Sequence, residues 1–97
     1  MGDPKTLTLD DFASLEGDPV TVGWEGGELE ARLIEVLPLG SGLRRGGGFS
    51  LLFHGPPEPR LTQATYRVEH RTVGAHDMFL VPVARTAAGI QYEAVFT

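Results

Sequence analysis

The sequence predicts a mostly β domain, either a small antiparallel β-barrel or a β-sandwich of about six strands, with one short N-terminal helix. Two observations predict this fold class. From residue 19 onward, short apolar runs are separated by glycine and proline, and before residue 19 only one segment has apolar residues at helical spacing. With 97 residues, the chain has the length of a single domain over 1–97. We expect the helix at about 9–15 and the β domain at about 19–96.

The helix is predicted within the segment TLDDFASLEGD, residues 8–18. Thr8 fits the N-cap position, and Asp11, three residues later, fits a capping box. Gly17 follows the last apolar residue of the pattern and ends the helix. Three apolar residues recur on one face of this helix: Leu9, Phe12 and Leu15. We expect this face to pack against the sheet.

Six strands are predicted from the apolar runs and from the turn residues between them. They cover residues 20–24, 28–39, 49–53, 62–70, 76–83 and 90–96. Between the first two strands, the sequence EGG predicts a tight hairpin in which Gly26 and Gly27 can take positive φ. The apolar phase of the second strand changes after Leu33, which predicts a β-bulge there. The third strand ends at GPPEP, because proline lacks the N–H group that a strand donates.

The segment VEHRTVGAHDMFLVPV, residues 68–83, predicts a second hairpin. With Val73 and Gly74 at the centre of its turn, His70 lies opposite Asp77. The apolar residues that share one face in this register are Tyr66, Val68, Phe79, Val81 and Val83. We expect this face to point toward the core.

The same register leaves Met78 and Leu80 on the other side of the hairpin, where polar residues would be expected. Either the apolar face of the helix or another copy of the protein has to cover them, since exposed apolar patches often mark interfaces. Met78 and Leu80 are therefore candidate interface residues. The glycine-rich loop GSGLRRGGG, residues 40–48, adds Arg44 and Arg45 as candidate contacts for an acidic partner.

His54, His70 and Asp77 are the candidate residues for a ligand site in the mouth of the barrel. A metal site needs three converging ligands, but the predicted hairpin places His76 on the face opposite to His70 and Asp77. A cross-strand hydrogen bond between His70 and Asp77 is the simpler interpretation. A serine hydrolase would use Ser50 as its nucleophile, and Ser50 lies in the middle of a strand instead of on a strained turn. We therefore expect no catalytic residue, no metal ligand and no cofactor.

Composition and charge argue against several functions. The chain has no cysteine, which removes disulfides, thiolate zinc sites and cysteine nucleophiles. Its formal net charge of −5 at pH 7 argues against nucleic acid as a partner, because nucleic-acid modules usually carry a basic face. No run approaches the roughly 18 apolar residues that cross a bilayer. Without a recognisable secretory signal, we expect a cytoplasmic protein by default, and export by a signal-independent route stays open.

Several blocks of the sequence follow one another in a distinctive order: TLDDFASLEGDPVTV, FSLLFHGP, LTQATYRVEH, GAHDMFLVPV and YEAVF. Together they resemble DUF6916, a family of small bacterial domains of unknown function, and the resemblance covers nearly the whole chain. Members of that family are often encoded near tail-fibre-like or phage-collar-like proteins, which implies a structural or adaptor role. The loop over 40–48 departs from the family pattern, so a contact made there would not be shared between members.

These observations predict a non-enzymatic structural or protein-interaction module. In one version the protein assembles with itself into an oligomer or fibre, through an edge strand or through Met78 and Leu80. In the other version it is an adaptor that binds a larger tail-fibre-like partner, as the resemblance implies. The alternative is a small-ligand or metal-binding barrel, or an enzyme, that uses His70, Asp77 and His54.

Overall fold

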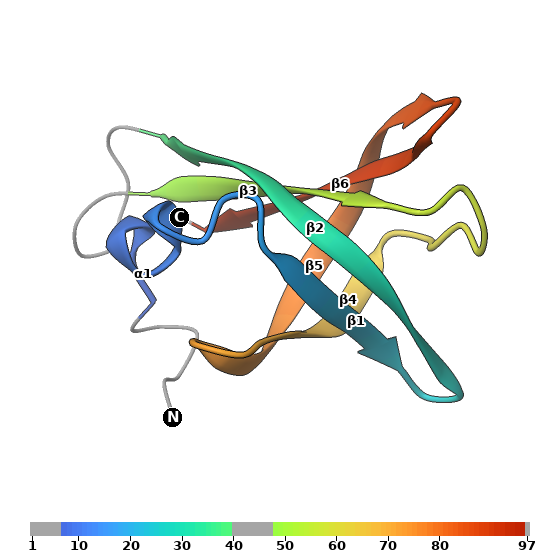
Figure 1. The fold of residues 1–97 in the computed structure, drawn as a ribbon, viewed down its shortest axis with the longest axis horizontal. Coiled ribbons are helices and arrows are strands. Elements are labelled where there is room, and N and C mark those ends of the chain that lie inside the picture. The colour runs from blue at the N-terminus through green and yellow to red at the C-terminus, as the bar shows by residue number, and fades with distance from the viewer. Residues whose placement is uncertain (1–6, 40–47, 97) are drawn as a thin grey trace.

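The computed structural model describes residues 7–39 and 48–96 and has the architecture of a closed antiparallel β-barrel with one short helix (Figure 1). Its elements are α1 (Leu9–Ala13), β1 (Pro19–Trp24), β2 (Gly27–Pro38), β3 (Phe49–Gly55), β4 (Ala64–His70), β5 (Gly74–Thr86) and β6 (Gly89–Phe96). Around the barrel, the strands follow the order β1-β2-β3-β6-β5-β4. The predicted fold class is confirmed, and of the two architectures that the sequence allowed, the barrel forms.

The helix α1 begins where the sequence predicts and ends earlier. The Asp11 carboxylate accepts a hydrogen bond from the backbone N–H of Thr8 at 2.8 Å, which is one half of the predicted capping box. The helix ends at Ala13, and Leu15 is buried in the turn that follows. Gly17 ends this turn with a positive φ of 94°, a conformation that glycine adopts without strain.

The two ends of the barrel are closed by different segments, which lie at opposite ends of the molecule in Figure 1. At one end, the Phe12 ring of α1 lies 5.8 Å from the Phe49 ring and 6.4 Å from the Phe96 ring, measured between centroids. This contact confirms the predicted packing of the helix on the sheet. At the other end, the connection between β3 and β4 buries Leu61, whose N–H donates to the Tyr92 hydroxyl at 3.0 Å. Apolar side chains therefore fill both ends of the interior.

The predicted hairpin between β1 and β2 forms. Trp24 pairs with Gly27, and Gly26 takes a positive φ of 104°. Of the two glycines only Gly26 uses this freedom, because Gly27 is already the first residue of β2 and lies against the Trp24 ring. The predicted β-bulge is confirmed, since the register of β2 on β3 shifts between Leu33 and Glu35.

The hairpin of β4 and β5 forms with a register that differs from the prediction. His70 pairs with Gly74 instead of Asp77, a difference of three residues (77 − 74 = 3). The turn occupies residues 71–73, and Gly74 follows it with a positive φ of 80°, so glycine ends the turn instead of lying at its centre. Because successive side chains of a strand point to opposite sides, an odd shift moves every side chain of β5 to the other side.

Met78 and Leu80 consequently belong to the core, with exposed fractions of 3% and 0%. The expectation that they form an interface is wrong. Met78 lines a small internal cavity together with Phe12 and Leu15. The sequence left open whether the helix or another copy of the protein covers Met78, and in the structure the helical end of the barrel covers it. Phe79, which the predicted register places inside, is 51% exposed.

The barrel closes between β1 and β4, so the edge strands expected at the ends of the strand series are paired. The pairs that close it are Thr21 with Glu69, Val22 with Val68, and Gly23 with Arg67. Beyond β1, the segment after α1 covers the edge of β2. The Leu33 N–H donates to the Asp18 carbonyl at 3.0 Å. The Val36 N–H donates to the Glu16 carboxylate at 2.7 Å, so these two amides are not free for strand addition.

Candidate functional site

The structure does not bring the three candidate ligand residues together. His70 is buried and points into the barrel at the end of β4. Asp77 lies on the outer side of β5, beside Arg67 of β4. His54 is half-buried on β3, and β2 and β1 separate it from β4 in the strand order. The shifted register is the reason that His70 and Asp77 lie on opposite sides of the barrel wall.

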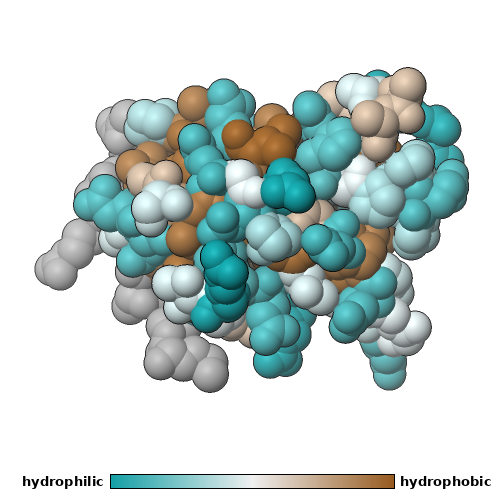
Figure 2. Space-filling model, viewed as in Figure 1, coloured by the Kyte–Doolittle hydropathy of each residue, from teal (hydrophilic) through white to brown (hydrophobic). Residues whose placement is uncertain are grey.

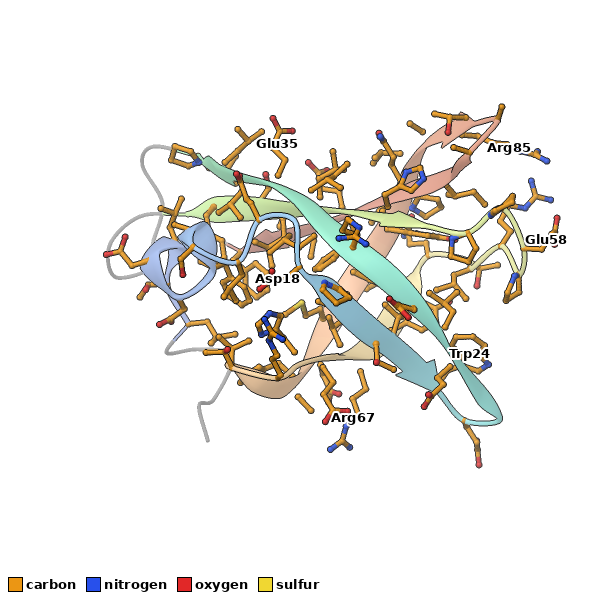
Figure 3. All side chains as sticks on the ribbon, in the orientation of Figure 1. Asp18, Trp24, Glu35, Glu58, Arg67 and Arg85 are labelled. Atoms are coloured by element: carbon orange, nitrogen blue, oxygen red, sulfur yellow. The ribbon has the colours of Figure 1, made fainter. Side chains whose placement is uncertain are left out.

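His70 is hydrogen-bonded to Asp18, which lies between α1 and β1 (Figure 3). Its Nε2 lies 3.0 Å from Asp18 Oδ2, and its Nδ1 accepts a hydrogen bond from the Thr72 N–H at 2.9 Å. Because Nδ1 accepts, the ring proton is on Nε2, which donates to the carboxylate. Both ring nitrogens are therefore engaged, and the pair ties the segment after α1 to the β4–β5 turn. The sequence-based interpretation missed Asp18, whose GDP context indicates only a turn.

His76 lies on the same inner side as His70, whereas the predicted hairpin places the two on opposite faces. Its Nε2 lies 2.7 Å from the carbonyl oxygen of Val73, to which it donates. Its Nδ1 has no hydrogen-bond partner among the described residues, although the side chain is only 4% exposed. The part of the chain that the structure describes contains no group of three histidine, aspartate or glutamate side chains that could hold a metal ion.

The barrel interior contains a cavity of about 10 Å³ beside His70. Its lining is apolar except for His70. This volume is close to the minimum that one water molecule needs. A ligand larger than water does not fit in this cavity, so the surfaces large enough to hold a partner lie on the outside of the barrel.

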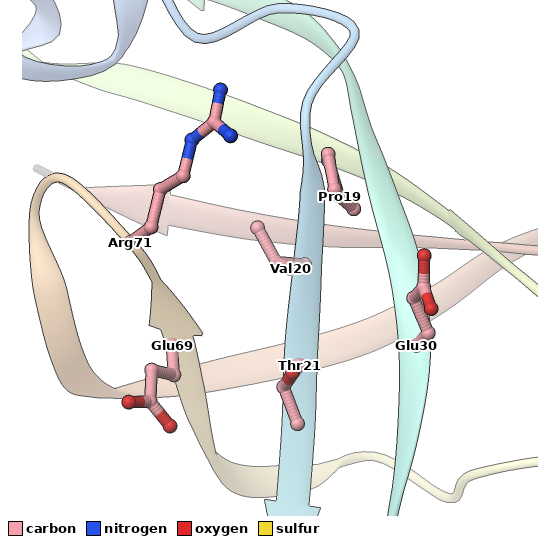
Figure 4. A pocket seen from close by; sticks show the side chains of 6 residues that line it. All are labelled: Pro19, Val20, Thr21, Glu30, Glu69 and Arg71. Atoms are coloured by element: carbon pink, nitrogen blue, oxygen red, sulfur yellow. The ribbon is translucent and has the colours of Figure 1, made fainter.

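On the outside, a shallow groove follows β1, because the outward side chains of this strand are small. Thr21 and Gly23 lie between charged residues of the two neighbouring strands: Glu28 and Glu30 on β2, and Arg67 and Glu69 on β4. A hollow of about 430 Å³ lies at Thr21, and its lining includes Glu30, Glu69 and Arg71. Figure 4 shows these side chains on β1 and on the segments beside it. Over β1 and β2, hydrophilic side chains predominate (Figure 2). This side of the barrel is a solvated surface with charges of both signs.

Apolar side chains gather on another part of the outside, across β2, β3, β6 and β5. We name this surface the outer apolar face, and it comprises Leu37, Leu52, Phe79, Val81 and Val95. In the register of the sheet, Ser50 lies between Leu37 and Val95. Phe79 precedes Val81 by two residues on the same side of β5. Leu37, Phe79 and Val95 are 45%, 51% and 54% exposed.

Two acidic residues lie among these apolar side chains. Glu35 pairs with Leu52, and Glu93 lies between Leu52 and Val81. Glu93 is half-buried, whereas Glu35 points outward from β2 (Figure 3). Neither glutamate forms an ion pair with any described residue. The outer apolar face is therefore also negatively charged.

Two predicted contacts, Arg44 and Arg45, lie outside the described residues. Among the described residues, no helix is both long enough and apolar enough to span a membrane.

A protein-family model described as a domain of unknown function (DUF6916) matches residues 7–96. No significant match was found among curated proteins or among solved structures.

Proposed function

The chain belongs to the DUF6916 family, and we propose that it is a non-enzymatic protein-binding module that uses the outer apolar face. The main observation in support is that Phe79 and Val95, on neighbouring strands, are each more than half exposed. Exposed apolar side chains on one face of a domain are typical of surfaces that another protein covers. The small volume of the internal cavity supports the same proposal, because it leaves the outside of the barrel as the surface for binding.

The proposed surface replaces the one expected from the sequence. Met78 and Leu80 are core residues, and Phe79 and Val81 on the other side of β5 take their place as interface candidates. The module would then hold a partner in place, as in the adaptor version of the sequence-based expectation. A larger tail-fibre-like protein is the partner that the family resemblance implies, although the proposal does not depend on that identity.

The alternative function, a small-ligand or metal-binding barrel or an enzyme, has weaker support. His54, His70 and Asp77 lie apart, and both ring nitrogens of His70 are engaged in hydrogen bonds. A general base needs a free nitrogen within reach of its substrate. His70 could act in this way only after breaking the bond with Thr72 or Asp18.

Site-specific crosslinking in the cells that make the protein tests the proposal. A photoreactive phenylalanine analogue replaces Phe79, and the same analogue replaces Thr21 on the polar side of the barrel as a matched control. We expect position 79 to crosslink to a defined protein, which mass spectrometry identifies, and position 21 to give no such product. No product at position 79, or the same products at both positions, would contradict the proposal.

A further inference from the structure

Resting on the proposed function, we infer that Glu35 and Glu93 determine which partner binds. The outer apolar face accepts a protein surface that carries arginine or lysine between apolar side chains, and it does not pair with a second copy of this chain. Glu93 lies within the face, with Leu52 on one side and Val81 on the other. A partner that covers these two apolar side chains therefore also covers the Glu93 carboxylate.

Covering Glu93 removes water from a group that is already half-buried. A carboxylate that loses water without gaining a partner destabilises the complex. An arginine or lysine on the partner replaces the lost water with a charge-assisted hydrogen bond, which is stronger than a neutral one. Glu35 pairs with Leu52 in the register, so a partner that covers Leu52 also comes close to the Glu35 carboxylate. A second cation on the partner would pair with this carboxylate. The favoured partner thus matches the face in both apolar surface and charge.

A second copy of the chain that presents the same face does not supply these cations. In a two-fold interface the same face meets itself, so Glu35 and Glu93 of both copies would enter one interface. Neither residue has a cation within ion-pair distance among the described residues, and the whole chain has a formal net charge of −5. Like charges brought together in this way disfavour the self-pairing. Nucleic acids and anionic lipids are disfavoured for the same reason, because their phosphates are negative.

An NMR titration with two synthetic peptides tests the inference. Both peptides carry the same apolar residues in the same order, with arginine at the intervening positions of one peptide and glutamate at those of the other. We expect the arginine peptide to shift the amide signals around Glu93 on β3, β5 and β6, and the glutamate peptide to leave them unchanged. Glu93→Gln should weaken binding at least about tenfold, because a charge-assisted hydrogen bond is lost. The double variant E35K/E93K should bind the glutamate peptide instead.

The matched control is Glu30→Gln, which neutralises an exposed glutamate of β2 that lies beside β1 and outside the face. This variant should bind the arginine peptide as the unmodified protein does. Equal binding of both peptides, lost in Phe79→Ser, overturns the inference and leaves the proposed function supported. Binding of the arginine peptide that Phe79→Ser does not weaken overturns both. Binding of neither peptide at millimolar concentration overturns the inference.

Analytical ultracentrifugation and vesicle co-sedimentation test the inference that neither a second copy of the chain nor an anionic membrane binds the outer apolar face. We expect the unmodified protein to remain a monomer in analytical ultracentrifugation up to millimolar concentration. A dimer that Phe79→Ser dissociates overturns the inference, because the face would then accept a second copy. Co-sedimentation with phosphatidylglycerol vesicles that Phe79→Ser abolishes overturns it as well, since an anionic membrane would then be the occupant.

Discussion

The two sides of β5 are equally apolar in the sequence and have opposite environments in the folded protein. Leu80 is fully buried, whereas its neighbour Phe79 is 51% exposed. Residues 78–81 are all apolar, so this part of the strand has no polar alternation that would indicate which side faces the core. The pairing of His70 with Gly74 decides the question, because it fixes the register of the hairpin. A single turn thus determines which half of an apolar strand becomes core and which becomes surface.

An aspartate placed first on one side of β5 and then on the other should give the largest difference in stability between the two sides. Leu80→Asp is expected to unfold the domain, because an unpaired carboxylate in the core costs several kcal/mol against a total stability of about 5–15 kcal/mol. Phe79→Asp is the matched control, and we expect it to fold with a loss of about 1 kcal/mol. Circular dichroism and thermal unfolding measure both variants. A folded Leu80→Asp protein would show that the register in the structure is wrong.

Most of the fold can be predicted from the sequence because it depends on neighbouring residues. The start of α1 after Thr8 and the β-bulge after Leu33 each follow from a few adjacent side chains, and the structure confirms both. The register of β4 and β5 depends on the type of turn, and the sequence RTVG is compatible with Gly74 either at the centre of the turn or directly after it. A choice made in error at this one residue exchanges core and surface along the whole of β5.

The candidate site is less predictable, because it depends on contacts between distant segments. Asp18 and His70 are 52 residues apart in the chain, and they meet because β1 pairs with β4 to close the barrel. Leu37 and Val95 lie within strands that the sequence predicts, but only the closed sheet shows that both face outward around Ser50. Local apolar patterns carry no information about such pairings.

The partner of His70 gives a second, smaller test of the two registers. Asp18→Ala is expected to lower the free energy of unfolding by about 1–3 kcal/mol, because the buried N–H of His70 loses its acceptor. Asp77→Ala removes the partner that the predicted register gives to His70, and we expect a change within about 0.5 kcal/mol, since Asp77 is exposed. Urea denaturation of the two variants gives both values. The opposite order of effects would favour the predicted register.

The turn itself gives the smallest and most direct test. Gly74→Ala is expected to cost about 1 kcal/mol, because an alanine at a φ of 80° is strained, even though an added Cβ at Gly74 meets no atom within 4 Å.

Val73→Gly distinguishes the turn in the structure from the predicted turn. In the predicted two-residue turn, Val73 and Gly74 both need positive φ, so this variant should gain stability. In the structure Val73 does not have positive φ and packs against the core. We therefore expect Val73→Gly to lose about 1 kcal/mol in urea denaturation, and a gain would mean that the two-residue turn forms instead.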